Sequence, residues 1–413
     1  IADTLGVDAL VEGSVRQAGD RLRVTAQLID ADDAFHRWSR TFERELTADN
    51  LFDVQEEIAR GVAAEMRREA VPRGGDRRLV RRPGMELETY RLYLRARYHW
   101  NRRTPGELAT AIRLYRRAIE RDSGFARAWA GLAGAYAVPT APIPPSRSLP
   151  LAKEAARRAL ALDSTLAPAH TALAYALMSH DWDWEGARRS FLRAIELDPG
   201  YATAHQWYGE WLAARGRTGE GVAAMRRAEE LEPLSMIIVW NVARGLYFDR
   251  RYEEAAVQVE KLRELFPDGR DADRTMAAIA WMRGREEAAL EHWLAGVPTE
   301  ARAAVRDSLA DGGMAALIRQ VRRWAEAQAA SVDDSLPRPG PEELESVVTL
   351  YAAPAWAMIE AGHEEKLLDV LERAVEARDL GGLTVDLATD PAYDPIRSHP
   401  RYRALLRRVN LAP

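Results

Sequence analysis

The stretch AIELDPGYATAHQW (Ala194–Trp207) decides the fold, because it is either a chemical site or the joint between two helices. It holds Glu196, Asp198 and His205, which are the residue types of a general acid–base group. Proline cannot continue a helix interior, however, and the Pro-Gly pair at 199–200 is a turn signal. We therefore interpret the stretch as a joint: one helix ends before the pair and the next begins after it.

The same kind of joint recurs along the chain. Matching endings occur in AIERDSGFA, ALALDSTLA, AIELDPGYA, AEELEPLSM and LRELFPDGR, with the equivalent position at Ser123, Ser164, Pro199, Pro233 and Pro267. The successive differences are 41, 35, 34 and 34 residues. The long first step contains a proline-rich insertion, Val138–Ser148. A steady period of 34 residues is typical of stacked helix pairs.

The segment WAGLAGAY (Trp129–Tyr136) fits the W-x-x-L-G-x-x-Y signature, with alanine replacing the glycine. His170 and His205 stand at the tryptophan position of later repeats. The chain thus resembles tetratricopeptide repeat (TPR) proteins over about residues 86–377. The resemblance implies a mainly α fold, an α-solenoid in which each antiparallel helix pair buries its face on the next. Replacing Trp129 or Phe191 with alanine is expected to cost roughly 3–5 kcal/mol if the side chain is fully buried.

In TPR proteins the first helices of successive pairs line a concave groove that holds a peptide or a partner segment. Carried onto this sequence, the resemblance places mixed polar and aromatic side chains in the groove. The predicted partner-binding residues are Arg127, Thr171, Tyr175, Gln206, Glu210, Trp240, Asn241, Arg244 and Tyr247. They lack the dense lysine and asparagine set of a peptide-carboxylate clamp. The alternative, that each is an ordinary solvated or inter-helix position, stays open.

The first seventy residues follow a different pattern. Period-two alternation predicts strands at Ala9–Gln17, Arg21–Ile29 and Phe35–Arg44, and the apolar spacing of LFDVQEEIARGVAAEMR predicts an amphipathic helix. Residues 1–68 resemble the latter part of the TolB N-terminal-like domain. That resemblance implies a partial α/β domain without known chemistry, as found ahead of repeat arrays in bacterial adenylate cyclase-like, serine/threonine-kinase-like and winged-helix regulator proteins. Residues 71–85 form a predicted linker, either a solvated hinge or a basic patch for phosphates.

Beyond Pro267 the repeats lose their register. We expect a helix pair turning at Gly284, two more helices around residues 312–313 and a loop at 331–341, so that the degenerate array covers 86–330. A last helix pair and a polar cap of the solenoid are predicted for 342–413. In the cap, Asp390, Asp394 and His399 each precede a proline, which suits the start of a short helix. The aspartates at 386, 390 and 394 are interpreted as structural rather than catalytic.

Composition narrows the function. The net charge is −5, which argues against a nucleic-acid-binding region, and the absence of cysteine excludes thiolate metal sites and cysteine nucleophiles. No nucleotide-binding, zinc-protease or serine-hydrolase motif occurs, so we expect no catalytic site, metal or cofactor in this chain.

The cluster SHDWDWEG, residues 179–186, could be a metal site or a turn between two helices. We favour the turn, with Asp183 capping the next helix. No apolar run reaches the length of a membrane span.

Three functional hypotheses remain. The first is a non-catalytic interaction or sensory scaffold, binding a protein or peptide and coupled to an upstream effector domain in the same polypeptide. The second is the regulatory region of an adenylate cyclase or serine/threonine kinase. The third is a small-molecule sensor that uses the α/β domain. Because the chain begins at Ile1 without methionine, we expect a fragment of a larger bacterial protein, with its localisation set by what lies upstream.

Overall fold

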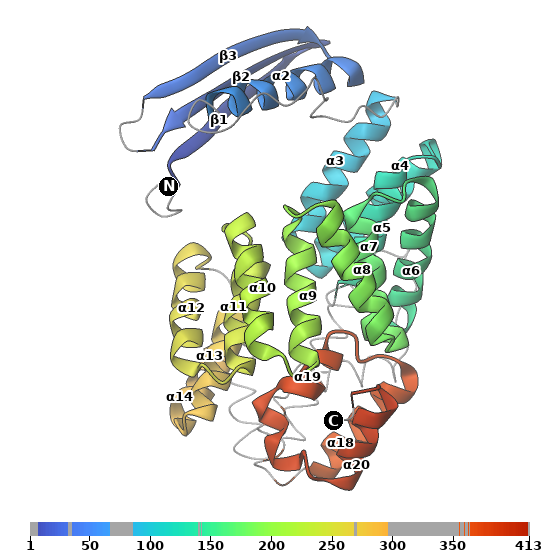
Figure 1. The fold of residues 1–413 in the computed structure, drawn as a ribbon, viewed down its shortest axis with the longest axis vertical. Helices are drawn as coiled ribbons and strands as arrows, with labels where there is room; N and C mark the ends of the chain where they lie inside the picture. The colour runs from blue at the N-terminus through green and yellow to red at the C-terminus, as the bar shows by residue number, and fades with distance from the viewer. Residues whose placement is uncertain are drawn as a thin grey trace. The chain divides into compact units, whose positions relative to one another are not determined.

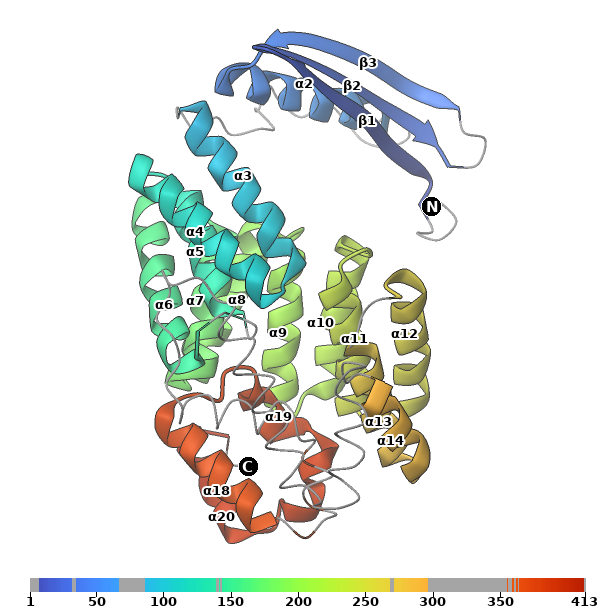
Figure 2. The same ribbon diagram turned by 180° about the vertical axis from the view of Figure 1, so that it is seen from behind.

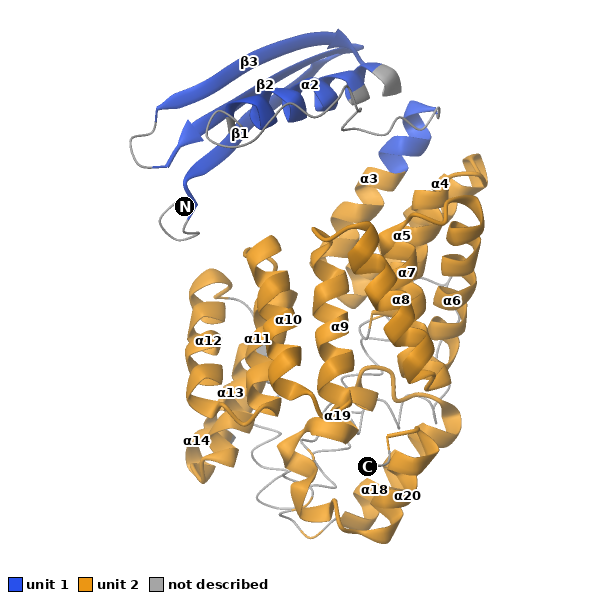
Figure 3. Ribbon diagram, in the orientation of Figure 1, with its two compact units in different colours: residues 1–92 blue, residues 93–413 orange. Residues whose placement is uncertain are grey.

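A computed structural model describes residues 7–31, 35–66, 86–138, 141, 143–267, 271–295, 355, 359, 362 and 364–411. The chain divides into two compact units, residues 1–92 and 93–413 (Figure 3). The predicted linker at 71–85, the two helices around 312–313 and the loop at 331–341 lie outside the described residues.

The first unit is an antiparallel sheet of strands β1 (Ala9–Ala18), β2 (Arg21–Asp30) and β3 (His36–Glu45), followed by helix α2 (Ala48–Met66). Gly19, at the β1–β2 turn, has a φ of 61°, which costs glycine little. Leu22, Val24 and Phe42 pack with Val54 of α2 in a small core. The predicted hairpin, third strand and helix are therefore confirmed.

Strand β1 is an edge strand of this sheet, and two of its apolar side chains are exposed. It stands at one end of the strand order, and Val11 and Val15 are 56% and 69% exposed. Both pair with buried residues of β2, Leu28 and Val24, so they share the sheet face on which α2 packs. Helix α2 thus covers the β2–β3 part of that face and leaves β1 bare.

The second unit is an array of paired helices, the first of which, α3, starts within the first unit (Figures 1, 2 and 3). Its helices up to residue 295 are α3 (Leu87–Arg102), α4 (Pro105–Arg121), α5 (Ala126–Ala137), α6 (Pro145–Leu162), α7 (Ala167–Ala176), α8 (Trp184–Leu197), α9 (Ala202–Ala214), α10 (Thr218–Leu231), α11 (Met236–Phe248), α12 (Tyr252–Leu265), α13 (Asp271–Met282) and α14 (Glu286–Ala295). A π-helical turn, η1 (Leu177–Asp181), lies between α7 and α8. The mainly α solenoid is therefore confirmed, although α6 begins inside the stretch predicted as a proline-rich insertion.

Three successive pairs begin with the same hydrogen bond. Trp129 Nε1 donates to a main-chain carbonyl at 3.0 Å. His170 Nε2 and His205 Nε2 lie 3.0 Å and 2.9 Å from the carbonyl at the same relative position, six residues earlier in each case. An imidazole N–H therefore replaces the indole N–H at this position, which explains why histidine is accepted in the tryptophan slot.

The turns before these helices also repeat. In each one the aspartate that ends the preceding helix accepts a hydrogen bond from the main-chain N–H two residues later, at 2.9, 3.0 and 3.1 Å for Asp122, Asp163 and Asp198. Such side-chain-to-backbone bonds stabilise tight turns. The stretch Ala194–Trp207 is thus a structural joint, with Asp198 ending α8 and His205 anchoring α9.

Close helix contact depends on glycine between α9 and α10. A Cβ built on Gly209 would lie 2.8 Å from the carbonyl oxygen of Gly221, and one built on Gly221 would lie 2.7 Å from that of Gly209. No side chain fits at such distances. Glycine at these two positions therefore lets α9 and α10 approach each other closely.

The C-terminal residues form α18 (Glu364–Ala377), α19 (Leu383–Thr389), the 3₁₀ helix η2 (Pro391–Ile396) and α20 (Pro400–Arg408). Asp390 and His399 cap η2 and α20 as predicted, each accepting a hydrogen bond from a main-chain N–H two residues on. The third predicted start, at Asp394, was wrong, because Asp394 and Pro395 lie inside η2. Arg401 ties α20 to Asp369 and Glu372 of α18. The segment was expected to cap the end of the solenoid, but α19 packs beside α9, in the middle of the array (Figures 1 and 2).

Candidate functional site

The residues predicted to line a partner-binding groove lie on the first helices of four pairs. Arg127 is on α5, Thr171 and Tyr175 on α7, Gln206 and Glu210 on α9, and Trp240, Asn241, Arg244 and Tyr247 on α11. Arg127, Trp240 and Arg244 are partly buried, and the other six are buried. Most of these side chains are therefore covered in the folded chain.

The cover over α11 is the chain's own C-terminal segment. Residues at three-residue steps on and just after α11 contact aspartates at four-residue steps on α19 and η2. The pairs are Arg244 with Asp386, Tyr247 with Asp390 at 2.7 Å, and Arg250 with Asp394 at 2.5 Å. We call these three contacts the acid ladder.

Other parts of the C-terminal segment contact the turn between α7 and α8. Arg378 donates to the main-chain carbonyl of His180, and Asn410 Nδ2 donates to that of Trp182 at 3.2 Å. In return, Trp184 Nε1 donates to the carbonyl of Val409 at 2.9 Å. The segment therefore spans the array from the α7–α8 turn to α11.

The buried end of the acid ladder holds more carboxyl groups than cations. Asp386 and Glu210 both act on the guanidinium of Arg244, and Asp386 also acts on Glu210. Burial raises the pKa of Glu210 to about 7 and that of Asp390 to about 6, because a charged carboxylate loses hydration there. Burial alone would lower the pKa of Arg244, but Asp386 and Glu210 outweigh it and hold that pKa above its ordinary value.

Several predicted groove residues serve the array itself. Thr171 Oγ1 donates to the carbonyl of Ala167 at 2.9 Å, and Asn241 Nδ2 donates to that of Ile237 at 2.8 Å. Trp240 Nε1 donates to Thr275 Oγ1 of the next pair at 2.9 Å. These contacts agree with the alternative that Thr171, Asn241 and Trp240 are ordinary positions within or between helices. Partner binding by the nine predicted groove residues stays a prediction.

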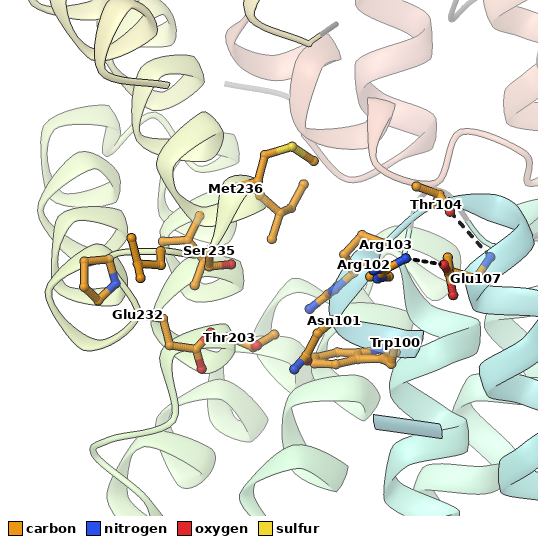
Figure 4. A pocket seen from close by; sticks show the side chains of 14 residues that line it. Trp100, Asn101, Arg102, Arg103, Thr104, Glu107, Thr203, Glu232, Ser235 and Met236 are labelled. Atoms are coloured by element: carbon orange, nitrogen blue, oxygen red, sulfur yellow. Dashed lines mark hydrogen bonds and ion pairs between the residues drawn. The ribbon is translucent and has the colours of Figure 1, made fainter. Parts of the chain in front are cut away.

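A cleft of about 850 Å³ remains open beside the covered region (Figure 4). Trp100 and Asn101, at the end of α3, lie on one side, and Thr203 and Glu232 on the other (Figure 4). The first turn of α11, residues 236–238, adds apolar lining. Leu234, in the α10–α11 turn, also lines the cleft and is 56% exposed. The cleft therefore combines apolar side chains with charged ones.

Arg103 lies between this cleft and the buried groups around Arg244, Asp386 and Glu210, which we call the covered cluster. Its guanidinium lies 3.7 Å from the ring centroid of Trp100, in a cation–π contact. Burial lowers the pKa of Arg103 to about 10, and Glu232 and Glu210 oppose that shift. Since Glu232 lines the cleft and Glu210 belongs to the covered cluster, one arginine lies within the electrostatic field of both.

The acidic cluster at 179–186 is a turn. Asp183 Oδ1 accepts a hydrogen bond from the N–H of Gly186 at 2.9 Å and caps α8, as predicted. Asp181 binds Lys153 Nζ at 2.6 Å and His180 Nδ1 at 2.9 Å. Among the described residues, no group of three or more histidine, cysteine or acidic side chains is arranged to hold a metal ion. Nor is any described helix both long and apolar enough to cross a membrane.

Sequence reasoning missed two parts of the site. It interpreted Asp386, Asp390 and Asp394 as structural residues and did not pair them with Arg244, Tyr247 and Arg250, although each set is evenly spaced along the chain. It also passed over Trp100 and Arg103, because the α3–α4 turn carries no repeat signature. Arg103 has a φ of 56°, a left-handed conformation that a non-glycine residue seldom adopts.

No family model matches the chain. "Putative adenylate cyclase 3" of Rhizobium meliloti (strain 1021) is 33% identical over 132 residues, which are 32% of this chain and 22% of that protein. The match thus spans about a fifth of the length of that relative.

Solved structures with similar helix pairs include YrrB, described as a TPR protein with an unusual peptide-binding site. It is 18% identical, covering 47% of this chain and 97% of its own, with a TM-score of 0.32. TTC0263, a thermophilic TPR protein of Thermus thermophilus, is 19% identical over 49% of this chain and 99% of its own, with a TM-score of 0.39. PilW, a type IV pilus biogenesis factor, is 18% identical over 54% of this chain and 93% of its own, with a TM-score of 0.38.

Proposed function

We propose that the array is a non-catalytic protein-binding scaffold, part of a larger bacterial signalling protein, and that its open cleft binds an extended segment of a partner. The observation that carries this proposal is the cleft between the α3–α4 turn and the start of α11. Its volume of about 850 Å³ lies in the range of sites that bury a ligand the size of a few side chains.

The lining favours a segment with one large apolar side chain. Trp100, Leu234 and Ile237 offer apolar surface, and the exposed fraction of Leu234 leaves it free to gain burial on binding. Glu232 and Arg103 supply opposite charges beside this surface. Apolar anchors with a polar rim are the usual anatomy of a binding site for a peptide.

A peptide library panned against the full chain tests this proposal. Selected peptides should carry a large apolar residue and should lose about tenfold or more in affinity when Leu234→Asp places a carboxylate in the cleft. The matched control is Val257→Asp, since Val257 is also an exposed apolar residue, 72% exposed, but lies on α12 outside the cleft. Selected peptides that bind both variants equally well would contradict the cleft assignment.

The second candidate is the regulatory region of a nucleotide cyclase. The match to an adenylate cyclase of 33% identity over 132 residues favours it over a kinase. The test is whether the gene joins this chain to a cyclase catalytic domain and whether Leu234→Asp then changes cyclase activity. A gene without such a domain would remove this candidate and leave the scaffold proposal standing.

A further inference from the structure

We infer that the α11 surface of the acid ladder is a binding site for an acidic segment of a protein partner, and that residues 383–396 occupy it as an internal ligand. The inference shares with the proposed function only the assumption that the array binds proteins. It concerns a surface of its own, since Arg244, Tyr247 and Arg250 do not line the open cleft.

The array side of the ladder offers donors. Arg244 and Tyr247 are three residues apart on α11, so their side chains lie on one face of the helix. Arg250 follows the helix end with a φ of 60°, a strained conformation for a non-glycine residue, and its guanidinium continues the row. Two guanidinium groups and one phenol O–H in a row require acceptors from whatever binds them.

The occupying segment supplies acceptors at a regular spacing. Asp386 lies on α19, Asp394 lies on η2, and Asp390 lies between the two helices with extended backbone, at a φ of −62° and a ψ of 120°. The three contacts show that all three carboxylates face the donors of α11 and Arg250. Each carboxylate meets one donor of the array. Charge-assisted hydrogen bonds of this kind are stronger than neutral ones, so the acids carry much of the recognition.

The hydrogen bonds between the C-terminal segment and the α7–α8 turn involve main-chain carbonyls, and so depend less on side-chain identity than those of the acid ladder. Arg378 and Asn410 bind main-chain carbonyls of the turn, and the carbonyl of Val409 receives the indole of Trp184. Any residue at those carbonyl positions would present the same acceptor. Two side-chain contacts accompany these bonds: Arg378 lies over the ring of Trp182, 4.5 Å from its centroid, and the Asp379 carboxylate accepts the N–H of Ser146 at 2.9 Å. The acidic side chains that meet donors of α11 and Arg250 are the three aspartates.

The binding of residues 383–396 to the array is weakened at both ends of the acid ladder. At the buried end, Glu210 and Asp386 share the charge of Arg244, and burial raises the pKa of Glu210 to about 7. At the outer end, the side chains of Arg250 and Asp394 are 50% and 40% exposed. A competing acidic segment can therefore begin by replacing Asp394 at Arg250 and proceed inward.

Charge complementarity defines the partner. It is a segment with Asp or Glu at three positions four residues apart and a break between two short helices at the middle acid, because that arrangement already fits the row of donors. Binding of such a segment releases residues 383–396. The apparent affinity is set by the fraction of molecules in which the internal ligand has left the surface.

The probe is a fluorescent peptide with the sequence of residues 383–397, LTVDLATDPAYDPIR, added to the full chain and followed by anisotropy. The variant Asp386→Asn with Asp394→Asn weakens the internal ligand and keeps Asp390 as the cap of η2. It should bind the probe about tenfold tighter than the wild type does. A peptide with all three aspartates changed to asparagine should bind neither protein, and Asp369→Asn, outside the ladder, should behave as the wild type.

Equal binding to the wild type and the folded double variant would overturn the inference, as would dimers of the chain forming in place of the peptide complex. If the double variant does not fold, hydrogen exchange of the wild type decides. Excess probe should speed exchange in residues 383–396, and unchanged exchange overturns the inference.

A covalent cross-link provides an independent test. Because the chain has no cysteine, Arg250→Cys and Asp394→Cys can be introduced together and joined by a short bis-maleimide, and probe binding must then be lost. Leu234→Asp should leave probe binding intact, which separates this test from that of the cleft.

Discussion

Tyr247 donates a hydrogen bond of 2.7 Å to Asp390, 143 positions further along the chain. The same Asp390 carboxylate accepts the N–H of Ala392 at 2.8 Å and thereby begins the helix η2. One side chain thus joins a local helix start to a contact between distant parts of the chain.

Tyr247→Phe should therefore destabilise the array although it removes a single oxygen. Asp390 would lose a donor while remaining desolvated, which costs on the order of 1–3 kcal/mol. Urea unfolding followed by circular dichroism measures the loss. The control is Tyr252→Phe, a partly buried tyrosine in the adjoining helix whose hydroxyl makes no hydrogen bond to the described part of the chain. Equal stability of both variants would contradict a structural role for the Tyr247–Asp390 bond.

Stability should fall as the pH rises from about 5 to 8. The folded state raises the pKa of Glu210 from 4.5 to about 7, so folding favours its protonated form. That contribution is fully present below pH 4.5 and is lost as the pH rises through 7, a change on the order of 3 kcal/mol. Asp390, with a pKa of about 6, adds a loss in the same direction at somewhat lower pH.

The comparison with Glu210→Gln isolates this effect. The charged groups that act on Glu210 are Arg244, Asp386 and Arg103, and all three remain in the variant. All other titratable groups are the same in both proteins, so their contributions cancel in the difference. The melting temperature of the wild type should drop relative to that of the variant between pH 5 and pH 8. Parallel curves would mean that Glu210 titrates at its ordinary pKa.

Phe191→Ala should cost more stability than Trp129→Ala. Phe191 is 0% exposed, so its removal leaves a cavity and should cost about 3–5 kcal/mol. Trp129 is only partly buried and keeps its indole at an exposed turn carbonyl, so the condition of full burial, on which the loss of about 3–5 kcal/mol depends, is not met at this position. Thermal unfolding of the two variants provides the measurement, and a larger loss for Trp129→Ala would reverse this ranking.

Gly209→Ala should destabilise the α9–α10 contact by about 1–3 kcal/mol, because the added methyl group would lie 2.8 Å from the Gly221 carbonyl. Gly219 provides the matched control in the same helix pair. A Cβ there meets its nearest atom, on Asp249, at an ordinary 3.8 Å. Gly219→Ala should therefore be neutral or stabilising by up to about 1 kcal/mol, as expected for a helical position. A neutral Gly209→Ala would show that the helices can separate at no cost.

The sequence predicted the repeats well because their causes are local. The turn aspartate at 198, the proline after it and the ring at 205 are all within eight residues, and each acts on its own backbone. The alternation of apolar and polar residues in Arg21–Ile29 likewise predicted a strand with one buried face, as observed in β2. Periodicity of this kind is visible in one sequence without any knowledge of tertiary contacts.

The covering of α11 could not be predicted in the same way. Arg244 and Asp386 are 142 positions apart, and the pairing depends on how the chain returns to the array. Asp390 and His399 were correctly predicted as helix caps, since capping is local, but the sequence could not say what else those turns would touch. The cleft was missed for a related reason, because its two walls come from α3 and α11.

Repeat arrays ordinarily unfold piece by piece, since each unit contacts only its neighbours. Here the C-terminal segment bonds to the α7–α8 turn and also to α11, and so spans units that do not adjoin. Unfolding either of them releases the segment from the other, which couples their stabilities. We therefore expect an array built from nearly independent modules to melt over this region in one concerted transition, and cutting the segment to turn that transition into a sequence of smaller ones.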